Sequence, residues 1–170
     1  EECEVRRLSL KEMKTLRSSI DELYTAVQEK SPVRLVKQNA SYLIWLVEKL
    51  GDKVQFLGIF HEGKLIGFLT GILDGKTFEA HHIGIDYHYN RSHAIYLNIL
   101  YLYIRMAIES KAELISFGRT ALEMKTTVGA IPVPHNAYIK LNNGMLNSLI
   151  KHLLPEKTSE DWIPRNPFRE

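Results

Sequence analysis

Residues 77–125 contain the pattern that most constrains the fold of this chain. An extended run, TFEAHHIGID, is followed by a long apolar segment, IYLNILYLYIRMAIES, and then by a second short extended run, LISFG. Two strands joined through a helix lie parallel in one sheet, with a right-handed crossover. In such units ligands collect where the carboxyl ends of the strands open. Those ends carry Gly84, Asp86, Tyr87, Asn90 and Arg91 after the first strand, and Gly118, Arg119, Thr120 and Glu123 after the second.

Upstream of this unit, the spacing of apolar residues predicts two helices. Ser9 and Glu12 have capping-box spacing, and the residues that follow predict one amphipathic helix of about five turns over residues 10–27. Asn39 and Gly51 bound a second helix. Glycine-containing turns then separate β-rich runs at residues 54–60, 65–73 and 76–86, which predicts a three-stranded antiparallel meander.

Downstream, residues 92–110 are apolar nearly all round, which predicts a helix packed between a sheet and other helices. A strand at residues 114–117, a short helix closed by Gly129, a last strand over residues 133–140 and a helix over residues 145–154 follow. The expected fold class is α/β (α+β): a mixed sheet in which an antiparallel meander precedes a parallel β-α-β crossover, with helices on both faces. We expect one domain over residues 1–154 and a surface-wrapping tail over residues 155–170.

Composition argues against several classes of function. The formal charge of +2 comes from 22 basic and 20 acidic residues mixed along the chain, so no basic surface points to nucleic acid. Asn98 and Arg105 interrupt the most apolar segment, so no membrane span is expected. The single cysteine, Cys3, forms no internal disulfide and suits the cytoplasm.

A metal site is not expected from the histidine pattern. The four candidate ligands lack the Cys or His-x-x-His spacing of zinc sites, and adjacent side chains on a strand diverge. These candidates are His81, His82, His88 and His93.

The local sequence resembles the GNAT acyltransferase superfamily, whose element order is the one predicted above. YNRSHAIYLNILYLYIRMAIES, ISFGRTALEMKTTVGAIPVP and the closing WIPRNPF are similar to its bacterial FemAB-like branch, which is related to the peptidoglycan-bridge aminoacyltransferases. The FGRT-x-x-x-x-K-x-x-x-G stretch is the most specific part, and the resemblance begins near Asn39. Members commonly have two GNAT-like halves. This chain resembles the C-terminal half, so an N-terminal half is an expected partner.

The resemblance implies transfer of an acetyl or aminoacyl group from a carrier to the amine of a small molecule or peptide. In the superfamily, the pantetheine arm of acyl-CoA lies between two splayed strands, which end here at residues 82–86 and 114–118. Ile83, Gly84 and Ile85 are therefore expected to contact the donor.

A loop before the long helix holds the donor pyrophosphate in the superfamily, and here Arg91 and Ser92 correspond to it. Ala94 and Tyr96 stand where that loop has glycines, and a tyrosine obstructs the close backbone approach that glycine permits. Two donors therefore stay open: acyl-CoA, and aminoacyl-tRNA, the only one that would involve nucleic acid.

Acyl transfer to an amine requires a base for the ammonium proton and an acid for the leaving group. Alternation places Glu79 and His81 on one face of their strand and His82 on the other, and each is a candidate base. The superfamily often uses a tyrosine after the fifth strand as the acid. The corresponding ALEMKTT has none, so Tyr87 or Tyr138 would replace it.

Four further residues are candidate substrate contacts: Arg119, Thr120, Glu123 and Lys125. The structural alternatives are an ion pair of Arg119 with Glu123 or Asp86, an N-cap at Thr120, and a solvated face for Glu123 and Lys125.

Two functions therefore remain. The first is an N-acyltransferase. The second is a catalytically silent GNAT-like module that binds a peptide, sugar-peptide or protein partner, for which the missing loop glycines and the missing tyrosine argue. A homodimer formed through the last strand is compatible with both.

Overall fold

A computed structural model describes residues 3–30, 38–135, 138, 140–144, 146–148, 163, 165 and 167. The chain divides into two compact units, Glu1–Thr120 and Ala121–Glu170. The single domain expected over residues 1–154 stays a prediction. The tail expected over residues 155–170 lies almost entirely outside the described residues.

The first unit contains a five-stranded mixed sheet in the order β1-β2-β3-β4-β5. Its first four strands are antiparallel, and β5 is parallel to β4, which confirms the predicted meander and crossover. Strand β1 was not predicted, because a four-residue edge strand with the sequence EVRR is too short for a hydrophobic pattern. The strands are β1 (Glu4–Arg7), β2 (Val54–His61), β3 (Lys64–Asp74), β4 (Thr77–Ile85) and β5 (Leu114–Ser116).

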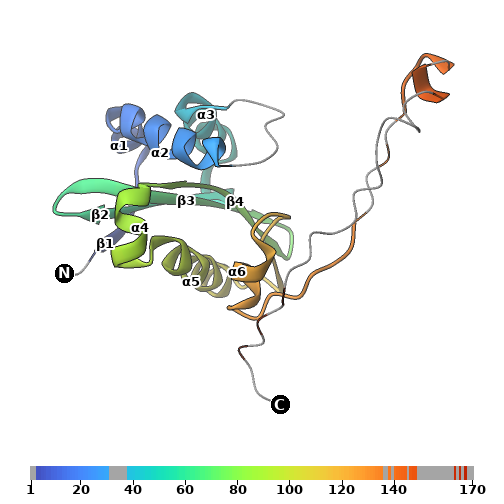
Figure 1. The fold of residues 1–170 in the computed structure, drawn as a ribbon. Coiled ribbons are helices and arrows are strands. Elements are labelled where there is room, and N and C mark those ends of the chain that lie inside the picture. Colours follow the sequence, from blue (N-terminus) through green and yellow to red (C-terminus); the bar gives the residue numbers. More distant parts are fainter. Residues whose placement is uncertain are drawn as a thin grey trace. The chain divides into compact units, whose positions relative to one another are not determined.

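Helices cover both faces of the sheet, as predicted (Figure 1). One face carries α1 (Leu10–Thr15), α2 (Arg17–Glu29) and α3 (Ala40–Leu50), and a 3-10 turn, η1 (Gly51–Lys53), leads from α3 into β2. The other carries α5 (Ile95–Glu109). Buried side chains of Phe56 and Phe68 pack on the first side, and those of Ile66 and Phe78 on the second.

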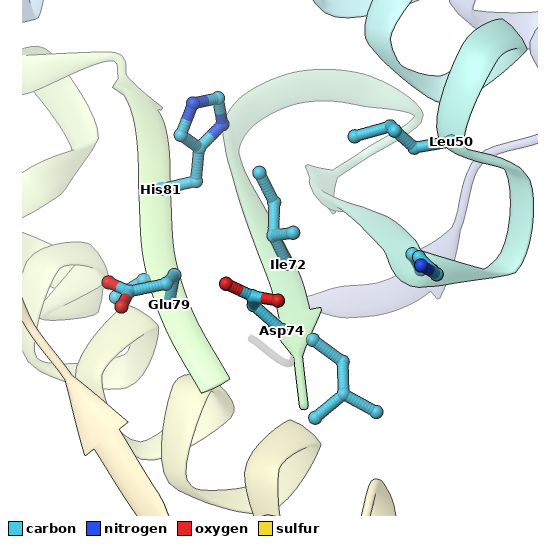
Figure 2. Close-up of a pocket in the computed structure, with 8 residues that line it drawn as sticks. Leu50, Ile72, Asp74, Glu79 and His81 are labelled. Atoms are coloured by element: carbon cyan, nitrogen blue, oxygen red, sulfur yellow. The ribbon is translucent and has the colours of Figure 1, made fainter. Parts of the chain in front are cut away.

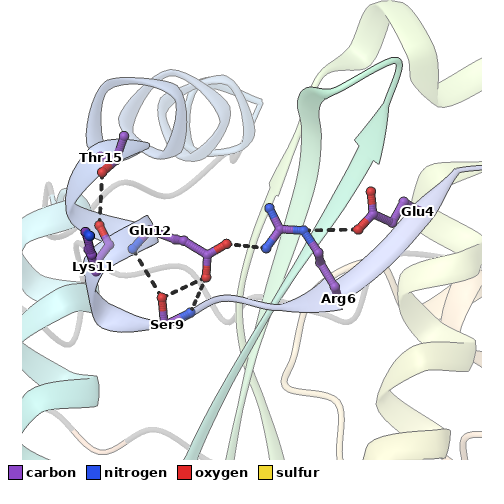
Figure 3. A network of polar contacts seen from close by, with 6 residues as sticks. All are labelled: Glu4, Arg6, Ser9, Lys11, Glu12 and Thr15. Atoms are coloured by element: carbon purple, nitrogen blue, oxygen red, sulfur yellow. Dashed lines mark hydrogen bonds and ion pairs between the residues drawn. The ribbon is translucent and has the colours of Figure 1, made fainter.

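The predicted capping box at the start of α1 is confirmed (Figure 3). Ser9 Oγ accepts from Glu12 N, and the Glu12 carboxylate accepts from Ser9 N at 2.9 Å and pairs with Arg6. These bonds, above all that from the Ser9 backbone, lower the pKa of Glu12 to about 2. The helix is shorter than predicted, because the backbone of Leu16 leaves helical geometry and separates α1 from α2.

The helix predicted over residues 92–110 corresponds to α5, which begins at Ile95, and a separate short helix precedes it. The polar sequence YHYNRSH forms α4 (Tyr87–His93), which Asp86 caps by accepting from His88 N at 3.0 Å. Ala94 then adopts the left-handed conformation with φ 47°, and α5 begins. One residue in a left-handed conformation therefore separates the two helices.

In the second unit, α6 (Leu122–Thr126) is closed by Gly129, whose φ is +82° and whose N–H donates to Thr126 O, as predicted. Of the last strand expected over residues 133–140, the described residues 133–135, 138 and 140 lie in no strand. The helix expected over residues 145–154 lies mostly outside the described residues. Among the helices described, none has the length and apolar character needed to cross a membrane.

Replacing Gly84 with alanine is expected to lower the free energy of unfolding by about 1–3 kcal/mol. The added Cβ would lie 2.0 Å from a ring carbon of Phe68 and 2.8 Å from Leu23 Cβ, so β4 and α2 would have to separate. Gly144→Ala is the control, because a Cβ there meets nothing within 4 Å. Urea denaturation measures both variants, and a Gly84→Ala protein as stable as the wild type would contradict this packing.

Candidate active site

A β-bulge in β4 organises the candidate site. In the register of β3 and β4, Leu69 lies opposite Ile83 and Gly71 opposite Ala80, so His81 and His82 together oppose Thr70. Thr70 Oγ1 accepts from His82 N at 2.9 Å and donates to His82 O at 3.2 Å. The threonine side chain thus replaces the ladder hydrogen bonds that the bulge interrupts.

The bulge brings the two histidines to the same face of the sheet. Their ring centroids lie 3.9 Å apart, and both rings contact Tyr42 of α3, at 6.2 and 6.0 Å. The expectation that His81 and His82 point to opposite faces is therefore wrong. Strict alternation requires a regular ladder, and the extra residue resets it.

Hydrogen bonds fix which nitrogen of His82 carries the proton. Tyr24 Oη donates to Gln38 Oε1 at 3.0 Å and lies 3.1 Å from His82 Nδ1. A hydroxyl has one proton to donate, so His82 Nδ1–H is the donor to Tyr24 Oη, and Nε2 keeps its lone pair. This tautomer is assigned from the hydrogen-bond network.

The same reasoning applies to His81, whose Nδ1 lies 3.3 Å from Thr70 Oγ1. Burial lowers the pKa of His81, against the opposing charge of Glu79, and burial with the neighbouring His81 lowers the pKa of His82 to about 4. Both imidazoles are therefore neutral near pH 7, and each offers Nε2 as a proton acceptor.

Glu79 and His81 line one pocket of about 460 Å³, so the structure brings together two of the three predicted catalytic residues (Figure 2). Both come from β4, Ile72 and Asp74 come from β3, and Leu50 from the end of α3. The other lining residues are Lys53, Leu73 and Ala80. Two carboxylates, an ammonium group and an imidazole thus surround a partly apolar hollow.

Beyond this pocket, β4 and β5 separate. Their pairing covers three positions, Thr77 with Leu114, Phe78 with Ile115 and Glu79 with Ser116. β4 continues to Ile85 along β3, whereas β5 ends at Ser116 and is followed by Gly118, whose φ of +68° favours glycine. Within the described residues, no strand pairs with β4 on this side after Glu79.

The predicted donor-binding residues Ile83 and Ile85 lie on this open edge. Asp86 N donates to Ile66 O at 2.8 Å, so alternation directs the main-chain groups of Gly84 toward β3 and those of Ile83 and Ile85 away from it. Their side chains pack on the α5 side of the sheet. Gly84 does not share this edge, and the close approach of Phe68 and Leu23 accounts for the glycine.

The predicted pyrophosphate-binding residues Arg91 and Ser92 are exposed on α4. The first turn of α5 is partly occupied within the chain, because Asn90 Oδ1 accepts from Tyr96 N at 2.9 Å. One of the backbone donors that an incoming phosphate would use therefore already has a partner.

The predicted acid Tyr87 is the first residue of α4 and does not line the pocket. Lys30 Nζ lies 3.5 Å above its ring, and burial raises the pKa of its hydroxyl. Sequence reasoning missed Tyr103, whose hydroxyl donates to His82 O at 3.1 Å and so supports the bulge from the α5 side. No sequence signal separates it from a packing tyrosine. Tyr138, the other predicted acid, is exposed in the second unit.

Arg119 and Thr120, both exposed, end the first unit. Of the alternative ion pairs, the one between Arg119 and Asp86 is not found among the described residues, where Asp86 pairs with Lys64 at 2.9 Å. Glu123 pairs with Arg165 within the second unit at 2.6 Å. The alternative of Thr120 as an N-cap is wrong, since the N-cap of α6 is Ala121 in the left-handed conformation.

Glu123 and Lys125 belong to α6 in the second unit. The solvated face suggested for Lys125 is wrong, because this side chain is buried and burial lowers its pKa to about 8. The sequence had no sign of this burial, since a lysine in a short polar helix is ordinarily exposed.

Comparison with known proteins identifies the fold. No protein-family model matches the sequence, and no curated protein matches it. Solved structures do match. A predicted acetyltransferase from Clostridium acetobutylicum, crystallised with acetyl-CoA, has a TM-score of 0.61 and 13% identity, over 83% of this chain and 96% of that chain.

Two other solved structures agree. An aminoglycoside acetyltransferase from an uncultured soil metagenomic sample, in complex with sisomicin, has a TM-score of 0.59 and 14% identity, over 82% of this chain and 97% of that chain. A GNAT family acetyltransferase from Staphylococcus aureus has a TM-score of 0.58 and 13% identity, over 83% and 100%. The chain therefore has the fold of GNAT acetyltransferases, which confirms the predicted fold class.

The imidazole of His82 is expected to titrate at about pH 4 in the folded protein, against an ordinary pKa of 6.5. Because the folded pKa is the lower one, the stabilisation linked to His82 is complete above about pH 6.5 and is lost as the pH falls toward 4. NMR titration of the histidine ring signals, assigned with His82→Gln, measures this value. A midpoint near 6.5 would show that the ring is not buried as described.

Proposed function

We propose that the protein is an N-acyltransferase that moves an acyl group from an acyl-CoA thioester to the amine of a small molecule or peptide. The observation that carries this proposal is the open edge of β4, where the main-chain groups of Ile83 and Ile85 face the gap left by β5. The pantetheine arm of coenzyme A is extended and carries amide groups. It can therefore pair with a free strand edge as an added strand does.

The pocket beside this edge supplies the base. Neutral His81 accepts, through Nε2, a proton from the acceptor's ammonium group, and the carboxylate of Glu79 favours the resulting imidazolium. The freed amine nitrogen attacks the thioester carbonyl carbon, the amide C–N bond forms and the C–S bond breaks. The departing thiolate takes a proton from a general acid. Tyr87, which lies outside the pocket at the start of α4 and two residues beyond Ile85, is the proposed acid.

The fold neighbours support this chemistry by analogy, since they include an acetyltransferase crystallised with acetyl-CoA and an aminoglycoside acetyltransferase crystallised with sisomicin. Arg119 and Thr120 of the first unit, and Glu123 and Lys125 of the second, stay proposed contacts of the acceptor. The FemAB-like branch, an N-terminal GNAT-like half as partner, a bacterial source and a cytoplasmic location stay parts of this proposal.

A second candidate is the catalytically silent module, and one observation favours it. Asn90 Oδ1 occupies the Tyr96 N–H at the start of α5, where the superfamily leaves backbone donors for the donor pyrophosphate. A donor without that anchor, such as aminoacyl-tRNA, or a peptide that pairs with β4, would then use the same edge.

Replacing His81 with glutamine is expected to lower the rate of acyl transfer by about 10²–10⁴-fold while acyl-CoA affinity changes little, because the ring acts on the acceptor's proton. Calorimetry with acetyl-CoA and longer acyl-CoAs measures binding, and thiol release with a panel of amines measures transfer. His88→Gln is the matched control, since His88 lies on α4 outside the pocket.

The outcomes separate the two candidates. Binding of a thioester with turnover that depends on His81 supports the enzyme. If no thioester binds, the proposal that acyl-CoA is the donor is contradicted. Salt-dependent binding of aminoacyl-tRNA would then support aminoacyl-tRNA as the donor. Retention of a peptide partner without any turnover in the wild type would establish the silent module.

A further inference from the structure

Three metal-ligating side chains from separate elements meet in the first unit, away from the histidines of the bulge. Cys3 immediately precedes β1, His61 ends β2, and His93 ends α4. A sulfur or ring-nitrogen atom from each lies within 4.8 Å of the corresponding atoms of the other two. The register of β1 and β2 explains why Cys3 and His61 lie close together. Glu4 lies opposite Phe60, so the next pair outward is Cys3 with His61.

A hydrogen-bond chain prepares His93 to bind a cation. Ser92 Oγ donates to Tyr89 O at 3.2 Å and lies 2.8 Å from His93 Nδ1. Because the serine proton is used on Tyr89, His93 Nδ1–H donates to Ser92 Oγ, and His93 Nε2 keeps its lone pair. Metal-bound histidines are ordinarily held in this way, with the second ring nitrogen bonded to an outer group.

The surroundings restrict the two rings. The rings of His61 and His93 lie 4.6 Å apart, and Tyr89 packs against both, at 5.6 and 5.7 Å. His61 is buried, whereas Cys3 and His93 are half-buried, so a cation can enter from solvent and still be partly shielded from water. Cys3 is a free thiol and forms no disulfide.

We propose that Cys3, His61 and His93 form a binding site for a divalent transition-metal ion, with zinc as the first candidate. One thiolate and two imidazoles with a fourth position open to solvent suit tetrahedral Zn²⁺. Bond lengths of about 2.3 Å to sulfur and about 2.1 Å to nitrogen place the ligand atoms roughly 3.3–3.8 Å apart. Because the ligand atoms lie within 4.8 Å of one another, side-chain movements of about 1 Å bring them to that spacing.

Binding is a simple exchange of ligands. The metal loses water molecules, the Cys3 thiol releases its proton to the solvent, and no electron is transferred. The bound ion would tie the edge strand β1 and the end of β2 to the junction of α4 and α5. The sequence does not reveal this cluster, because its members are far apart in the chain. Of the three, His93 alone belongs to the histidine pattern described above.

Zinc alone is the probe that tests the site. Protein stripped with a chelator is titrated with Zn²⁺ against a competing indicator, and Co²⁺ is added separately to record the absorption bands of thiolate ligation. We expect one equivalent of Zn²⁺ per chain and a thiolate-to-cobalt band. Cys3→Ser and His93→Gln should each weaken binding roughly tenfold or more, whereas His88→Gln, also on α4, should not change it.

A fold-stability readout accompanies the titration and does not depend on acyl transfer. Zn²⁺ should raise the melting temperature of the wild type and of His88→Gln, but not that of Cys3→Ser or His93→Gln. Circular dichroism of each variant verifies folding. The proposal is overturned if the wild type binds Zn²⁺ no more tightly than the Cys3→Ser protein, or if the Co²⁺ complex lacks a thiolate band. Neither result would affect the proposed acyltransferase.

Discussion

The candidate site depends on the point along β4 where this strand is no longer paired with β5. β4 keeps β3 along its length but shares only three positions with β5. An unpaired strand edge costs free energy because main-chain donors and acceptors lack partners, so it persists only where the fold prevents closure. The short β5, which ends at Ser116, and the left-handed backbone of Gly118 keep this edge open here. A donor that pairs with Ile83 and Ile85 would recover that energy.

The bulge places chemistry next to this edge. An extra residue opposite Thr70 turns His81 and His82 to one face, where burial keeps both rings neutral and Glu79 lies in the same pocket as His81. Tyr103 and Tyr24 hold the bulge from the two faces of the sheet, through His82 O and His82 Nδ1. The polar network thus fixes both the strand geometry and the tautomers.

Local patterns predicted most of the fold, because turn glycines, caps and periodicity are read over a few neighbouring residues. The capping box at Ser9, the helix between Asn39 and Gly51 and the three meander strands are examples. The short strand β1 and the break at Ala94 were not foreseen, since neither has a pattern longer than a few residues.

Several features of the candidate site were predicted wrongly because they are set by tertiary contacts. Only the register of β3 against β4 reveals that His81 and His82 share a face. The burial of Lys125 and the pairing of Glu123 with Arg165 likewise require residues distant in the chain. The placement of Glu79 with His81 was predictable because it follows from alternation below the bulge.

The most direct test of the open edge follows the backbone amide signals of β4 by NMR while acetyl-CoA is added. If the donor pairs with the strand, the amide signals of Ile83 and Ile85 should shift together and saturably, and that of Gly84, which faces β3, should shift less. Saturable binding that leaves Ile83 and Ile85 unmoved would contradict the account, because the donor would then lie elsewhere on the protein.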